Sequence, residues 1–151
     1  RFIVRSDSGN VLTASKNGND LFIERNGNIF FRVYGSEEFS VASTGTMSPC
    51  QPLNEGSQGY ILGLVRDSKD IFESKIIRLL NNYTGDYETL KKDMKISSGD
   101  EFGFGFIYNN RTEIKTTERN VTINVYADRS PVQYIKTDGA MESGFIDTII
   151  W

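Results

Sequence analysis

The chain has 151 residues, of which 38% are hydrophobic and 25% are charged, a balance typical of one globular domain with a sizeable core. Its net charge of −3 and the scatter of its basic residues argue against nucleic acid as a partner. No apolar run approaches the roughly 18 residues that a membrane-spanning helix needs. We therefore expect a single domain over residues 1–151, without a membrane span.

The chain contains no histidine and a single cysteine, Cys50. The absence of histidine excludes Ser-His-Asp and Cys-His nucleophiles and the zinc sites that use histidine. Cys50 has no second cysteine in this chain with which to form a disulfide. The sequence also lacks a glycine-rich phosphate loop, an EF-hand loop and a paired-cysteine zinc motif. We expect neither catalytic residues nor a metal or cofactor site.

The first third of the chain has the pattern of an antiparallel meander. Asn17-Gly18 and Asn26-Gly27 tolerate the positive φ angles of type I′ hairpin turns. The turns separate short segments rich in β-branched and aromatic residues. The strands expected here are residues 11–16, 21–25, 29–34 and 39–43. A loop with proline and glycine follows, and residues 60–65 form the next apolar run.

The middle of the chain is its least β-like part. Apolar residues recur there at helical spacing, and Ser68 and Asp70 suit a first helical turn. The apolar residues are Phe72, Ile76, Leu79 and Leu80. The pattern predicts one short helix over about residues 68–81, although residues 75–80 also fit a strand. Tyr87, Leu90 and Met94 form a weaker helical stripe.

Residues 101–108 alternate strictly between aromatic residues and glycine. A strand would place Phe102, Phe104, Phe106 and Tyr108 on one face and two glycines on the other. Bare glycines permit a ring, a backbone or a ligand to approach closely, and they also occur in bent core strands. The pattern therefore predicts a strand with one bulky face and one nearly bare face.

The remainder of the chain returns to short strands separated by turns. The expected strands are residues 114–117, 121–126, 132–135 and 144–151, with a turn at 118–120, an interruption at 128–131 and a turn at 137–139. About nine strands and one or two helices predict an all-β fold, an antiparallel β-sandwich of immunoglobulin-like or jelly-roll-like type. A β-trefoil is the alternative, because Phe2–Thr13 looks like one trefoil repeat.

The sequence ends inside its last expected strand, Gly144–Trp151. Such a strand either closes a sheet or offers an unpaired edge to another strand. The order Val121–Ala127, Pro131 and Gly144–Trp151 resembles the C-terminal end of spore-coat-U and archaic chaperone–usher pilins, which finish with Gly-Tyr-x-Asp-Thr-Val. The resemblance covers about the last thirty residues.

The resemblance implies an incomplete immunoglobulin-like sandwich whose missing strand comes from a periplasmic chaperone or a neighbouring subunit. It also implies an extracellular or cell-surface pilus subunit or tip adhesin. We expect the groove for the donated strand to be lined by six apolar residues. They are Phe102, Phe104, Phe106, Phe145, Ile149 and Trp151.

Two other functions are weaker alternatives. A carbohydrate- or receptor-binding domain of a surface, toxin or viral or phage attachment protein could use tyrosine rings as sugar platforms. The candidate rings belong to Tyr60, Tyr83, Tyr87, Tyr108, Tyr126 and Tyr134. A glycosidase would need a pair of carboxylates, for which the candidates are Glu37, Glu38, Asp100, Glu101 and Asp147.

Overall fold

The structure of the chain is a computed structural model, and it describes all residues except 25–26, 28, 41–42, 45–46, 57–58 and 117–124. The chain divides into two compact units, an N-terminal unit (Arg1–Lys69) and a C-terminal unit (Asp70–Trp151), and each is described by itself. The expectation of one sandwich domain over residues 1–151 stays a prediction. As the sequence predicts, the described part of the chain is mostly β, with ten strands and two helices.

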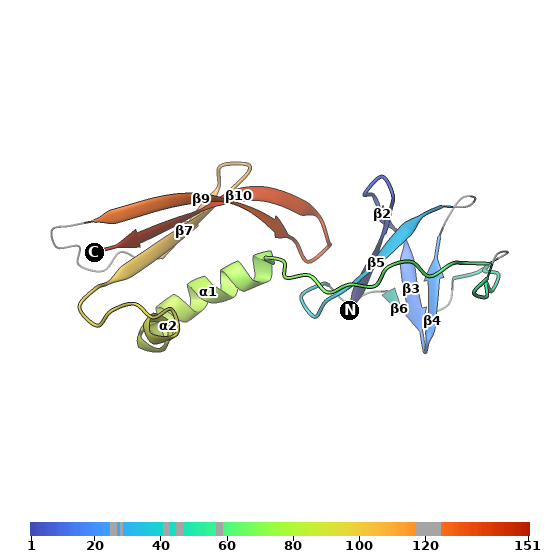
Figure 1. The fold of residues 1–151 in the computed structure, drawn as a ribbon, viewed down its shortest axis with the longest axis horizontal. Coiled ribbons are helices and arrows are strands. Elements are labelled where there is room, and N and C mark those ends of the chain that lie inside the picture. The colour runs from blue at the N-terminus through green and yellow to red at the C-terminus, as the bar shows by residue number, and fades with distance from the viewer. Residues whose placement is uncertain (25–26, 28, 41–42, 45–46, 57–58, 117–124) are drawn as a thin grey trace. The chain divides into compact units, whose positions relative to one another are not determined.

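The N-terminal unit contains two small sheets (Figure 1). In the first, β1 (Phe2–Ser6) lies between β2 (Val11–Leu12) and β5 (Phe31–Gly35), and both pairings are antiparallel. In the second, β3 (Ala14–Asn17) pairs antiparallel with β4 (Asp20–Ile23) and parallel with β6 (Ser43–Thr44).

The predicted meander is correct for its first hairpin and wrong for its third strand. Gly18 has a φ of 56°, and Asn17 pairs with Asp20 across the turn, as expected for an Asn-Gly hairpin. The third strand, β5, pairs with β1 instead of β4, which places Val33 opposite the fully buried Val4. Packing around Val4 is a long-range effect that turn residues cannot reveal. Asn26 lies outside the described residues.

The later part of the N-terminal unit has little regular structure. Phe39 and Ser40 of the strand expected at 39–43 are not in a strand, and residues 41–42 lie outside the described residues. Tyr60 makes one isolated bridge with Glu55. The rest of the apolar run, Ile61–Val65, has neither helix nor strand.

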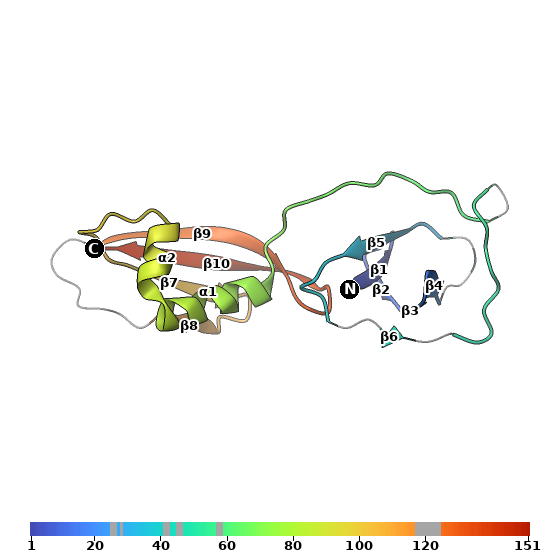
Figure 2. The ribbon, with the colours of Figure 1, turned by 90° about the horizontal axis from the view of Figure 1, so that it is seen from below.

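The C-terminal unit is a four-stranded antiparallel sheet with two helices against one face. The strand order is β8 (Glu113–Lys115), β7 (Phe102–Tyr108), β10 (Met141–Ile150) and β9 (Tyr126–Ile135). Figures 1 and 2 show α1 and α2 along the same side of this sheet. In the described part of this unit helices cover the buried face, so the β-sandwich and the alternative β-trefoil stay predictions.

The predicted helix forms, but it is shifted toward the C-terminus. α1 runs over Glu73–Gly85 instead of residues 68–81. Phe72 forms a bridge with Ile135 of β9, and Ile135 donates a backbone hydrogen bond to the Ile71 carbonyl. These contacts hold the chain extended up to residue 72, so the helix can begin only after it. The weaker stripe becomes α2 (Tyr87–Asp93), whose N-terminus is capped by the Asp86 side chain.

The core of the C-terminal unit consists of two aromatic clusters between the helices and the sheet. Tyr83, Tyr87 and Leu90 surround Phe102 and Phe104 in the first cluster. In the second, Ile76 packs with Phe106 and Tyr134, which are both 0% exposed. The rings of Phe106 and Tyr134 meet edge to face, with 5.1 Å between their centroids. The strict alternation of residues 102–108 therefore predicted the buried face correctly.

The interruption expected at residues 128–131 does not occur, because β9 continues through Pro131. Proline interrupts a strand that is paired on both sides, but β9 is the edge of its sheet. An edge strand needs hydrogen bonds on one side only. The turn expected at 137–139 is present, with Gly139 at a φ of 84° between β9 and β10.

Candidate functional site

The last strand, β10, lies in the interior of the sheet. Residues Gly144–Ile150 pair with β7 on one side, and Met141–Ile150 pair with β9 on the other. The backbone of Trp151 exchanges two hydrogen bonds with Glu101, of 2.7 and 3.0 Å. β10 is thus paired along both of its edges within the C-terminal unit, and the unpaired edge expected as one alternative is not found on this strand.

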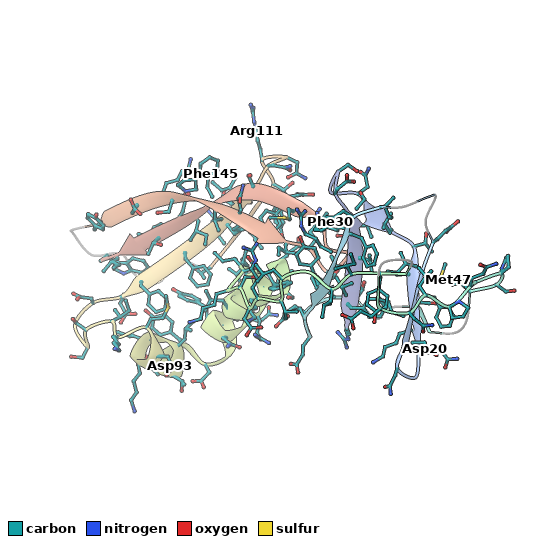
Figure 3. The ribbon with its side chains drawn as sticks, turned by 45° about the vertical axis from the view of Figure 1, so that its right-hand side comes forward. Asp20, Phe30, Met47, Asp93, Arg111 and Phe145 are labelled. Carbon is teal, nitrogen blue, oxygen red and sulfur yellow. The ribbon has the colours of Figure 1, made fainter. Side chains whose placement is uncertain are left out.

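The six residues predicted to line one groove lie on opposite faces of the sheet. Phe102, Phe104 and Phe106 are at most 6% exposed and face the helices. Phe145 is 43% exposed (Figure 3). By the register it shares the other face with Ile149 and Trp151, which are half-buried. The register explains the separation, since Phe145 pairs with Ile107 and not with an aromatic residue of β7. The structure therefore does not bring the six together.

The bare glycine face of β7 is filled from within the same chain. A Cβ atom added at Gly103 would lie 3.4 Å from the Trp151 ring and 3.1 Å from Thr116 Oγ1. The close approach that glycine permits is thus made by the terminal tryptophan. The sequence predicted an approaching ring as one alternative, but it gave no indication that the ring would be Trp151.

The face of the sheet away from the helices carries an ion pair at its centre. Arg129 of β9 donates two hydrogen bonds of 2.6 Å to the carboxylate of Asp147 on β10. These bonds lower the pKa of the Asp147 carboxyl group. Asp147 is therefore held as a charged acceptor in this ion pair.

One of the two sheet edges, β9, is blocked to strand addition. Trp151 exchanges backbone hydrogen bonds with Glu101. Because such bonds alternate along an antiparallel pair, the N–H and C=O groups of odd-numbered residues of β10 point toward β7, and those of even-numbered residues point toward β9. The backbone groups of the odd-numbered residues of β9, including Pro131, then point outward from this edge of the sheet. Proline has no N–H, so the middle of this edge offers no donor to an incoming strand.

The other edge, β8, is open in the described part of the structure. Thr116 donates its backbone N–H to the Phe104 carbonyl, and Tyr108 donates to Thr112, so even-numbered residues of β8 face β7. The N–H and C=O groups of Glu113 and Lys115 therefore point away from the sheet. They make no backbone hydrogen bond on that side with any other described residue.

A hollow of about 420 Å³ lies beside β8, between this strand and α1. Its apolar lining comes from Ile77 and Leu80 of α1 and from Ile114 of β8. The remaining lining residues are Asn81, Thr84, Tyr108, Lys115 and Thr116. We refer to the hollow and the outward backbone groups of Glu113 and Lys115 together as the β8 site. An extended peptide that pairs with β8 would direct alternate side chains into this hollow.

Sequence analysis missed the β8 site, although it placed both of its elements. Ile77 and Leu80 are three residues apart and therefore lie on one side of a helix. Ile114 belongs to an expected strand that follows the aromatic strand. Nothing in the sequence indicates that this strand is the open edge, because strand order depends on contacts between distant residues.

The tyrosines considered as sugar platforms are mostly unsuited to that role. Tyr83, Tyr87 and Tyr134 are at most 5% exposed, so their ring faces belong to the core. Tyr60 and Tyr126 are 43% and 70% exposed, but they belong to different units. Carbohydrate binding stays a prediction that no tyrosine cluster supports.

The described residues contain no group of three or more acidic, cysteine or histidine side chains able to hold a metal ion. Among the same residues, neither helix has the length and apolar character needed to cross a membrane. The chain matches no protein-family model, no curated protein and no solved structure. Function must therefore be argued from the geometry of this chain alone.

Replacing Pro131 should open the second edge of the sheet. Pro131→Val supplies an outward N–H in the middle of β9, and valine has a high β-propensity. We expect the variant to keep its fold and, at equal concentration, to form larger species than the original chain, measured by analytical sedimentation. The control is Gln133→Val, which changes an exposed position on the same edge whose outward N–H is already present. Equal association of the two variants would show that Pro131 does not protect the edge.

Proposed function

We propose that this chain is an extracellular structural or adhesive subunit that assembles by β-strand addition, with the β8 site as the acceptor. The observation that carries the proposal is that the outward backbone groups of Glu113 and Lys115 lie beside a hollow partly lined by apolar side chains. Main-chain hydrogen bonds supply affinity in this mode of recognition, and pockets for alternate side chains supply specificity. The pilin resemblance supports the same function, with the acceptor strand moved from the chain terminus to β8.

The contrast between the two edges of the sheet supports the choice of β8. An edge that serves no partner is commonly protected by proline, and β9 carries Pro131. β8 has no proline, and between its charged residues Glu113 and Lys115 the apolar Ile114 lines the hollow. A sandwich fold is not required for this function, because one open edge beside a groove is enough.

The proposal is tested by removing the outward donor of Lys115. Lys115→Pro deletes an N–H that points away from β7, so the β7–β8 hydrogen bonds stay intact. We expect the purified chain to bind short synthetic peptides of alternating apolar residues. The substitution should weaken that binding by about tenfold or more, because the incoming strand loses a main-chain partner. Isothermal titration calorimetry measures the change.

Lys115→Ala is the matched control, since it removes the same charged side chain and keeps the N–H. It should bind the peptides with nearly the affinity of the original chain. Circular dichroism confirms that both variants are folded before binding is compared. If no peptide of this class binds, or if both variants lose binding equally, strand addition at β8 is overturned.

A further inference from the structure

An apolar segment of the chain lies uncovered in the N-terminal unit. Ile61, Leu62, Leu64 and Val65 are 82%, 65%, 89% and 78% exposed. The segment has no helix or strand, and its backbone makes no hydrogen bond with the other described residues. Two pairs of large, exposed apolar residues on either side of Gly63 form a patch of the kind that marks an interaction site.

The sequence of this segment fits the β8 site. In an extended conformation Leu62 and Leu64 lie on one face, and Ile61, Gly63 and Val65 lie on the other. If the backbone of Ile61, Gly63 and Val65 pairs with the outward groups of Glu113 and Lys115, the side chains of Leu62 and Leu64 lie on the same face of the sheet as Ile114. That face leads into the hollow lined by Ile77 and Leu80. In this register the backbone of the segment meets the open backbone groups of β8, and its leucine side chains meet the apolar part of the hollow.

We infer that the occupant of the β8 site is residues 61–65 of a second copy of this chain. This inference rests on the proposed function and adds the identity of the partner. Each copy carries one donor segment and one acceptor site, so the interaction is heterologous and extends into a chain of subunits unless rotation closes it into a ring.

Pairing of the segment with a second copy produces species larger than the monomer, whereas pairing within one copy would leave it monomeric.

The test uses the full chain in analytical sedimentation over a range of concentrations. We expect species larger than the monomer, which an excess of a synthetic peptide of residues 59–67 should dissociate. Leu64→Asp removes an apolar side chain from the donor and should weaken association by about tenfold or more. Ile61→Asp is the matched control, because the same change falls on the face away from the hollow. It should associate much more strongly than Leu64→Asp.

Mixing two defective variants identifies the interface. Leu64→Asp lacks a working donor and Lys115→Pro lacks a working acceptor, so each alone should stay monomeric. An equimolar mixture should form a heterodimer and nothing larger, since only one competent donor and acceptor remain for each pair. A mixture that stays monomeric, or a Leu64→Asp chain that associates normally, overturns the inference.

The same measurements separate this inference from the proposed function. If the chain stays monomeric and ignores the 59–67 peptide, but still binds other alternating apolar peptides in a Lys115→Pro-sensitive way, the donor is wrong and the β8 site stands. If no peptide binds and the chain stays monomeric, both proposals fail.

Discussion

Replacing Phe106 with alanine should lower the free energy of unfolding by about 3–5 kcal/mol. The side chain is 0% exposed and packs against Ile76 and Tyr134, with its ring edge to face with those of Tyr108 and Tyr134. The substitution removes buried apolar surface and leaves a cavity that rigid neighbours cannot fill. Urea unfolding followed by circular dichroism measures the change.

Phe145→Ala is the matched control on the opposite face of the same sheet. Phe145 is 43% exposed and has cross-strand neighbours in Ile107 and Pro131. Its loss should cost about 1 kcal/mol or less, the usual size of a cross-strand contribution. Similar losses for the two phenylalanines would contradict the assignment of the aromatic face of β7 to the core.

Raising the pH from 10 to 12 should destabilise the protein by several kcal/mol. Burial raises the pKa of Tyr87 from 10.0 to about 12, helped by its hydrogen bond to Glu101. Burial also raises the pKa of Tyr108 from 10.0 to about 12, and that of Tyr134 is raised as well. The unfolded chain therefore releases these protons at lower pH than the folded chain does. Stability is fully present below pH 10 and falls as the pH rises toward 12.

The contribution of Tyr87 is on the order of 2 kcal/mol, because one pKa unit corresponds to about 1.4 kcal/mol. Its OH donates to Glu101, which also accepts a bond of 3.1 Å from the buried Lys91, so this proton sits in a polar network. Urea unfolding at several pH values gives the slope. Tyr87→Phe removes one titrating group and should make the slope shallower. An unchanged slope would show that Tyr87 does not contribute to the alkaline loss of stability.

Local patterns in the sequence predicted the kind of several elements. The Asn17-Gly18 turn, the helix around residues 73–85 and the aromatic strand at 102–108 all form. The alternation of aromatic residues and glycines along this strand also predicted that Phe102 and Gly103 lie on opposite faces of the sheet. These features depend on backbone preferences and side-chain periods within a few residues, which a sequence displays directly.

Local sequence patterns could not predict which strands pair or which strands form the sheet edges. The start of α1 is set by the bridge between Phe72 and Ile135, and the neighbour of β5 is β1 instead of β4. Pro131 has the sequence appearance of an interruption but stands inside an edge strand. Each outcome depends on a residue distant in sequence, so no local pattern could predict it.

By itself, the amino-acid sequence determined that the chain is mostly β, that it has a helical middle and that it cannot use histidine chemistry. Only the tertiary structure decided that the terminal strand is interior, that the six expected groove residues lie on two faces, and that β8 is the open edge. The physical reason is that backbone hydrogen bonds and burial in a sheet are satisfied between distant segments.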